Sequence, residues 1–169
     1  IGTGNSDDQD WQDNLDPRLL GGSPNPNAGI LNVSGGGEGV SATTYIQNGS
    51  TWKYLDDGSN QGTAWRTVGF NDSGWQSGPA ELGFGDNDET TIINSGPAGQ
   101  RFATTYFRKV VNIDNPAVFG DFELLLTYDD SYAVFVNGSE VARHPGLSQN
   151  AAFNEFSSNV VANNAIDTL

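Results

Sequence analysis

A short acidic loop is the first place where residue types and spacing indicate chemistry. The segment FGDNDETT, residues 84–91, carries Asp86, Asp88 and Glu89 close together. Calcium takes about six to eight oxygen ligands, and alternating carboxylates in one loop can supply several of them. We therefore predict these three side chains as candidate calcium ligands. The loop lacks the full pattern of a helix–loop–helix calcium site, so a solvated turn is the alternative interpretation.

A second group of residues is typical of carbohydrate sites. Such sites place an aromatic ring beside Asp, Asn or Arg side chains that hydrogen-bond sugar hydroxyls. Trp65 is followed directly by Arg66, and we predict that Trp65 is exposed. Asp129 and Asp130 are predicted as further polar ligands at the end of the same domain. The alternative is that the tryptophan packs in the core and the aspartates cap turns.

Catalytic residues are harder to find. The chain has no cysteine and one histidine, His144, and no serine lies in a nucleophile-elbow motif. We expect His144 to lie in a surface loop ahead of Pro145. Carboxylate pairs of the glycosidase kind can be drawn, such as Asp129 with Asp86, but no spacing selects one of them. The sequence therefore predicts a protein that is not an enzyme and uses no organic cofactor.

The charge of the chain limits its partners. Seven Lys and Arg residues stand against 21 Asp and Glu residues, which gives a formal net charge of -14. Such a field repels phosphate backbones and anionic lipid surfaces, so we expect no nucleic-acid partner. No apolar run approaches the roughly 20 residues that span a bilayer, so we expect no membrane insertion. The same acidity attracts cations, although it also serves to keep a secreted protein soluble.

The elements that would position these residues are predicted to be strands. YDDSYAVFVNGSEVARH, residues 128–144, indicates a hairpin with Asn137 and Gly138 in its turn, because these residues tolerate the positive φ that a tight turn requires. A two-residue turn would set Phe135 opposite Glu140. It would also set Val134 opposite Val141 and Tyr132 opposite Arg143.

The rest of the chain divides into an arm and a β-rich part. Residues 1–40 are rich in Gly, Asn, Asp and Pro and read as an acidic arm or linker. From residue 41 onward, apolar runs alternate with turn residues, which predicts an antiparallel β-sandwich of jelly-roll type over 41–169. The expected strands cover residues 43–46, 51–55, 80–84, 104–113, 122–128, 132–136, 140–144 and 153–158. In 122–128 the apolar side chains alternate with Glu123 and Thr127.

Three segments together carry a resemblance to a known family. They are Trp65 with FNDSGW (70–75), TYFR (105–108) and DDSYAVFVNGSEV (129–141). This combination resembles a galactose-binding-like jelly-roll module of large secreted bacterial proteins, over about residues 50–169. The resemblance implies a non-catalytic, extracellular accessory module that binds a polysaccharide or other glycan, or acts as a spacer. It is specific for a fold rather than for a ligand.

The end of the chain departs from that family. The family pattern continues beyond a segment like NNAIDTL, residues 163–169, into another turn and one more apolar strand. The resemblance therefore implies a sandwich without its last strand and with an open sheet edge. A strand from the arm, from another protein chain or from a copy of this chain would fill the gap. This is the basis of an alternative function, a structural or assembly subunit of an extracellular fibre or complex joined by strand addition.

Overall fold

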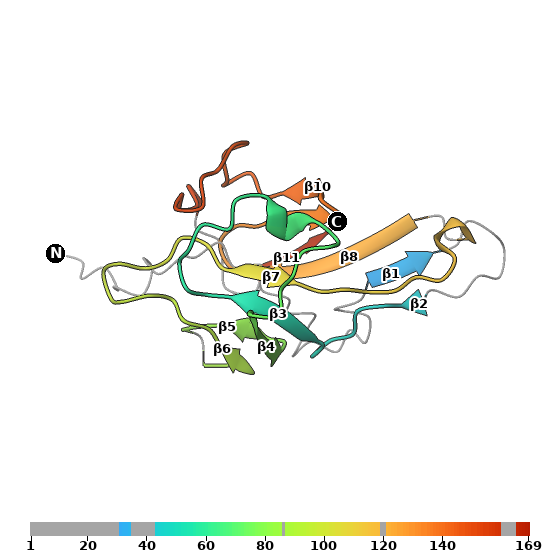
Figure 1. Ribbon diagram of the computed structural model, residues 1–169, viewed down its shortest axis with the longest axis horizontal. Coiled ribbons are helices and arrows are strands. Elements are labelled where there is room, and N and C mark those ends of the chain that lie inside the picture. The colour runs from blue at the N-terminus through green and yellow to red at the C-terminus, as the bar shows by residue number, and fades with distance from the viewer. Residues whose placement is uncertain (1–30, 35–42, 86, 119–120, 160–164) are drawn as a thin grey trace.

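The protein is built from short strands in small sheets (Figure 1). The structure, a computed structural model, describes residues 31–34, 43–85, 87–118, 121–159 and 165–169. The described strands are β1 (Leu31–Ser34), β2 (Thr43–Thr44), β3 (Thr51–Leu55), β4 (Gln76–Pro79), β5 (Leu82–Gly83), β6 (Thr91–Ile92), β7 (Tyr106–Arg108), β8 (Asp121–Tyr128), β9 (Ala133–Val136), β10 (Ser139–Arg143) and β11 (Ala165–Thr168). Two 3₁₀ turns, η2 (Ala64–Arg66) and η3 (Pro116–Val118), complete the described elements.

The longest strand, β8, organises a four-stranded antiparallel sheet in the order β11-β8-β1-β2. Its first half, residues 121–124, pairs with β1, and its second half, residues 125–128, pairs with β11. Leu169 extends the β11 pairing, because its amide and carbonyl both bond to Leu124 at 2.9 Å. β1 comes from the range predicted as an arm, so these four residues of that range pair with the domain.

The second sheet adjoins or contains two of the three segments of the family resemblance. β3 pairs antiparallel with β4 on one side and with β7 on the other. β7 carries the end of the TYFR motif, and β4 begins directly after FNDSGW. A further pair, β5 and β6, is parallel and only two residues long. β3 matches the predicted 51–55, whereas β4 and β6 were not expected from the sequence.

The hairpin of β9 and β10 is present, with a correction to its register. Asn137 and Gly138 have φ of 51° and 90°, as the predicted turn requires, and Phe135 lies opposite Glu140. Beyond this pair a bulge inserts Val141, so Val134 lies opposite Ala142 rather than Val141. A two-residue turn fixes register only as far as the first irregularity, and the bulge moves every later partner by one position. Arg143 therefore lies opposite Ala133 and not opposite Tyr132.

Other predicted strands are shortened or wrong. The expected 104–113 contracts to β7, 80–84 to β5 and 43–46 to β2. The expected strand over 153–158 is wrong, since this segment consists of turns and irregular structure. Thr127, expected on the polar face of β8, is buried, because both faces of the end of this strand are covered.

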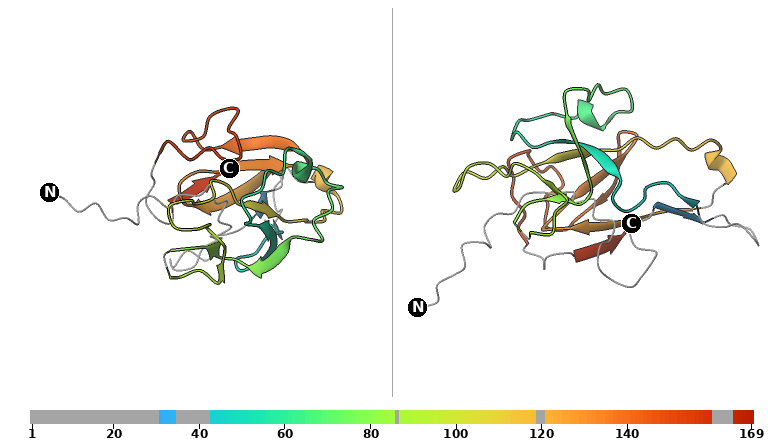
Figure 2. Two further views of the ribbon diagram at one scale, coloured as in Figure 1. Left: turned by 60° about the vertical axis from the view of Figure 1, so that its left-hand side comes forward. Right: turned by 90° about the horizontal axis from the view of Figure 1, so that it is seen from below.

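The buried residues form separate clusters rather than one core. One cluster joins β3, β5 and β7 through Tyr54, Leu82 and Phe107. Another joins the η2 turn to β7 through Trp65, Trp75 and Tyr106, and Phe135 of the hairpin packs against it. The third lies on β8 around Leu126, Tyr128 and Tyr132. The second cluster brings the η2 turn, drawn green, beside the hairpin (Figures 1 and 2).

These observations establish an all-β protein with almost no helix. The described sheets are small and do not close into a barrel or a complete sandwich. Among the described residues, no helix has both the length and the apolar character needed to cross a bilayer.

Candidate functional site

A cavity of about 430 Å³ lies where the η2 turn, the start of β7, the hairpin and the loop after it meet. Small-molecule sites in proteins have volumes of roughly 300–1,000 Å³, so this one suits a small ligand or one or two sugar units. Its lining includes Asn60, Trp65, Arg66, Thr104, Tyr106, Phe135, Arg143 and Asn154. They come from four separate parts of the chain, and folding alone brings them together.

Aromatic rings form the apolar part of the wall. Trp65 stands edge-on to both Tyr106 and Phe135, with ring centroids 5.1 Å and 5.6 Å away. Burial is the main cause that raises the pKa of Tyr106, while the Gln61 amide and the charge of Arg66 oppose it. The phenol therefore keeps its proton at neutral pH. The wall combines apolar ring surface with a protonated hydroxyl.

Arg66 supplies the charge of this wall. Its guanidinium carbon lies 4.0 Å from the centre of the Phe135 ring and 5.7 Å from that of Trp65. Both distances fall within the range of cation–π attraction. The Nε of Arg66 and the indole Nε1 of Trp65 are buried donors that meet no acceptor among the described residues. Two buried donors of cavity residues thus have no acceptor in the part of the chain that the structure describes.

Arg143, on the opposite part of the wall, is held by its own strand. Its Nε and Nη2 donate to the two carboxylate oxygens of Glu140, each at 2.8 Å, and its Nη1 donates to the Ser148 carbonyl at 3.0 Å. The hydrogen bond from Arg143 is the main cause that lowers the pKa of Glu140. This pair orients Arg143 and fastens the loop after β10 to the hairpin.

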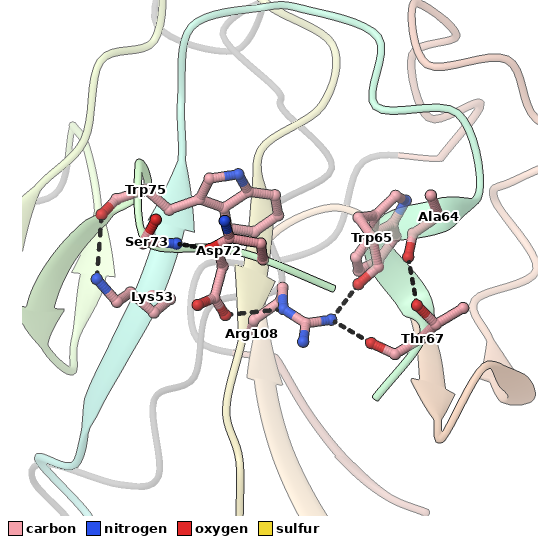
Figure 3. Close-up of polar contacts among 9 residues, drawn as sticks. Lys53, Ala64, Trp65, Thr67, Asp72, Ser73, Trp75 and Arg108 are labelled. Atoms are coloured by element: carbon pink, nitrogen blue, oxygen red, sulfur yellow. Dashed lines mark hydrogen bonds and ion pairs between the residues drawn. The ribbon is translucent and has the colours of Figure 1, made fainter. Parts of the chain in front are cut away.

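Arg108 braces the turn that carries Trp65 and Arg66 (Figure 3). Its Nε donates to Asp72 of the FNDSGW segment at 2.9 Å, and the side chain of Arg108 is 10% exposed. Its Nη1 donates to the carbonyls of Trp65 and Thr67. The last residue of TYFR therefore ties two loops to β7. The residues that carry the resemblance thus act together in positioning one wall of the cavity.

The structure places the predicted sugar ligands in two different environments. Trp65 and Arg66 lie together in the cavity wall. The prediction that Trp65 is exposed is wrong, because the residue is 8% exposed and packs against Tyr106 in a cluster with Trp75. Asp129 and Asp130 do not line the cavity, and Asp130 is 0% exposed. A carboxylate buried to this extent cannot contact a ligand.

The predicted calcium loop is described only in part. Asp88 is exposed and Glu89 is half-buried, whereas Asp86 lies outside the described residues. No group of three or more His, Asp or Glu side chains suited to a metal occurs among the residues that the structure describes. Calcium binding by this loop stays a prediction.

His144 is not the surface residue that the sequence indicated. It is 7% exposed, and its Nδ1 accepts a hydrogen bond from the Gly146 amide at 3.1 Å. Ser131 Oγ lies 2.9 Å from the same nitrogen and 2.6 Å from Ser157 Oγ. We call these four residues, Ser131, His144, Gly146 and Ser157, the sealed cluster.

The sealed cluster resembles a nucleophile and its base only in its distances. Ser131 is 0% exposed, and a nucleophile must touch its substrate. A side chain on Gly146 would begin 2.7 Å from both serine oxygens, so the cluster has no free space. Its arrangement suits the anchoring of the loop after β10, not catalysis.

Sequence reasoning missed most of the cavity. Phe135 and Arg143 lie in a hairpin that was predicted. The sequence did not show which segment packs against this hairpin, so the face that lines a cavity could not be identified. Tyr106 lies in TYFR, which suggested only a strand. Asn154 belongs to a segment that was expected to be a strand. The apolar run of β9 was the one available signal, and it does not tell a cavity from a core.

Comparisons with known proteins add no identity. The chain matches no family model, and neither the curated proteins nor the solved structures gave a match. The resemblance to galactose-binding-like modules therefore rests on the motif residues described above.

Proposed function

We propose that this protein is a non-catalytic carbohydrate-binding module and that the cavity between η2 and the hairpin is its binding site. One observation carries the proposal: aromatic rings and polar donors converge on one cavity of suitable size. Sugar rings present apolar faces that stack on aromatic side chains, and their hydroxyls take hydrogen bonds from arginine, amide and hydroxyl groups. Phe135 and Tyr106 would supply the ring contacts. Arg66, Asn60 and Asn154 would supply the polar ones.

The composition of the wall supports binding rather than hydrolysis. Glycoside hydrolysis uses two carboxyl groups that flank the scissile bond. None of the described residues that line the cavity is Asp or Glu. The histidine and serine that lie together are buried outside it. A ligand in this cavity would be held without meeting a pair of catalytic acids.

The finer fold and location belong to the same proposal. We infer a galactose-binding-like jelly roll from the joint role of Arg108, Asp72 and Trp65, which ties the motif segments into one structural unit. Modules of that kind act outside the cell, beside the catalytic domains of secreted bacterial proteins. The calcium loop at residues 84–91 would then stabilise the module rather than contact the ligand.

A glycan array followed by calorimetric titration tests the site. We expect Phe135→Ala to weaken binding of any glycan hit by about tenfold, because stacking contributes about 1–1.5 kcal/mol beyond burial. Val136→Ala is the matched control, since Val136 is the next residue on β9, is 54% exposed and does not line the cavity. It should leave affinity unchanged. An array without hits, in the presence of calcium, would refute the proposal.

A structural role by strand addition is the second candidate. β11 lies at the edge of its sheet, and among the described strands it pairs only with β8. Ile166 at this edge is half exposed. A strand of another chain, or of a second copy, would find free backbone groups there. Light scattering after size exclusion separates the candidates: a monomer supports the binding module, and a polymer or stable complex supports strand addition.

A further inference from the structure

The charge of the cavity is opposite to that of the protein. The chain has a formal net charge of -14 and only seven Lys and Arg residues. Two of these seven, Arg66 and Arg143, line the cavity, while no described residue of its lining is acidic. In a chain with three times as many acidic as basic residues, a cavity whose described lining holds two arginines and no carboxylate differs from the rest of the molecule.

The two arginines differ in how their charges are balanced. Arg143 is bound through two hydrogen bonds to Glu140, which neutralises most of its charge locally. Arg66 makes ring contacts with Phe135 and Trp65, and no hydrogen bond or ion pair joins it to another described residue. Glu140 also feels the charge of Arg66, but its carboxylate is hydrogen-bonded to Arg143, so Arg66 is the less neutralised of the two arginines.

The hydrogen-bonding groups of the wall point to the same kind of ligand. Arg66 and Trp65 both hold buried donors without an acceptor. These two atoms are themselves inaccessible, so a ligand would meet the rest of the Arg66 guanidinium, which lines the cavity and favours a group that brings acceptors and negative charge. A guanidinium also presents its donors in a plane, which matches the two oxygens of a carboxylate better than single hydroxyls.

We propose that the cavity selects an acidic sugar, a uronate whose carboxylate pairs with Arg66 while its ring packs on Phe135. This inference rests on the proposed carbohydrate-binding function and adds the class of sugar. Arg143 acts beside it as a fixed wall, held in place by Glu140. The ring contacts keep the guanidinium of Arg66 oriented before the ligand arrives, so less conformational entropy is lost on binding.

Oligosaccharides of galacturonate, glucuronate and mannuronate, each compared with its fully methyl-esterified form, test the inference. The ester keeps the sugar and removes the charge. We expect the free acids to bind at least about tenfold more tightly than the esters, as a charged hydrogen bond of about 1.5–3 kcal/mol implies. The preference should shrink as salt is added.

The results separate this inference from the function on which it rests. Equal binding of acids and esters, or binding of neutral glycans alone, would overturn the acidic-sugar inference and leave carbohydrate binding in place. No binding of any acidic, esterified or neutral glycan would overturn both.

Variants assign the preference to Arg66. Arg66→Gln should abolish the difference between acid and ester, and Arg66→Lys should keep part of it. Lys109→Gln makes the same change in net charge outside the cavity and should leave the preference intact. Thermal melts check that each variant folds. If Arg66→Gln does not fold, Arg66→Lys still tests the assignment. A preference that survives Arg66→Gln would contradict the assignment.

Discussion

The sealed cluster and the cavity show two uses of polar residues in one domain. In the sealed cluster, Ser131, His144 and Ser157 satisfy one another, and no space remains between them. In the cavity, Arg66 and Trp65 keep donors that no described residue accepts. Both regions adjoin the hairpin and the loop after it. The sealed cluster looks more like a catalytic centre, yet the cavity is the region that can meet a ligand.

The difference teaches how polar contacts divide between stability and binding. A buried hydrogen bond contributes about 1 kcal/mol when made, and leaving one partner unsatisfied costs about 1–3 kcal/mol. Groups that satisfy one another therefore stabilise the fold and cannot also bind. A guanidinium that lines a cavity and has no hydrogen bond to a described residue, as in Arg66, can gain that energy from a ligand. Changes in the sealed cluster should alter stability more than binding, and changes at the cavity wall should alter binding more than stability.

The largest effect is expected from Gly146→Ala, which would break the sealed cluster. The added carbon would lie 2.7 Å from the oxygens of Ser131 and Ser157 and 3.0 Å from Nδ1 of His144. We expect the free energy of unfolding to fall by about 2–3 kcal/mol. Urea unfolding measures this. Because the cluster anchors the loop that carries Asn154, glycan affinity of the folded fraction should also fall, but by less than in Phe135→Ala. A variant as stable as the parent would show that the cluster is not closely packed.

Arg108→Gln should lower both stability and glycan affinity, because Arg108 is only 10% exposed and also positions the cavity wall. It removes the ion pair with Asp72 and the bonds to two carbonyls of the η2 turn. We expect a loss of about 2 kcal/mol in stability together with weaker glycan binding. Lys53→Gln, which removes one bond to the Trp75 carbonyl at 3.2 Å, is the control. Normal affinity in Arg108→Gln would show that the turn holds its shape without the brace.

Stability at alkaline pH tests the aromatic residues that pack beside the sealed cluster. Tyr132 and Tyr128 pack against the ring of His144. Burial, followed by the hydrogen bond to Asp167, raises the pKa of Tyr132 above its ordinary value of 10.0. A raised pKa gives stability that is complete below the unfolded pKa and is lost as pH rises above it. Between about pH 8 and 11, wild type should therefore lose roughly 1 kcal/mol more than Tyr132→Phe.

Thermal melts at the two pH values measure this difference. The variant should still lose some stability, because burial also raises the pKa of Tyr54 and Tyr106. Equal losses in wild type and Tyr132→Phe would place Tyr132 outside the alkaline transition.

The smallest effect is expected from Glu140→Gln, at the rim of the cavity. The hydrogen bond from Arg143 lowers the pKa of Glu140 below 4.5. A lowered pKa gives stability that is present above the unfolded pKa and is lost as pH falls through the folded one. The difference in Tm between wild type and Glu140→Gln should thus be constant above about pH 5 and vanish toward pH 3. A difference that persists in acid would assign the effect of the substitution to packing.

Local signals explain what the sequence could and could not predict. Asn137 and Gly138 determine their turn through their own backbone preferences, and alternation in β8 identifies a strand. The bulge at Val141 depends on packing beyond the hairpin, so the register after Glu140 was not predictable. Very short strands such as β5 and β6 exist only through tertiary contacts, and propensity does not identify them.

The candidate site was predictable only in the pair Trp65 and Arg66. Their side-by-side position in the sequence suggested a shared site, and both line the cavity. The burial of Trp65 was not predictable, because it depends on packing with Tyr106 and Trp75 from other segments. Arg143 and Asn154 reach the cavity through the loop after β10, whose path follows from the sealed cluster rather than from local preference.

An NMR titration of the labelled protein with the oligosaccharide of highest affinity tests the central claim most directly. We predict that amide shifts change at residues 60–66, 104–106, 133–135 and 143–154, which surround the cavity. Asp129, Asp130 and the acidic loop at residues 87–89 should change little. Shifts confined to those aspartates or to that loop, with the cavity unaffected, would contradict the account.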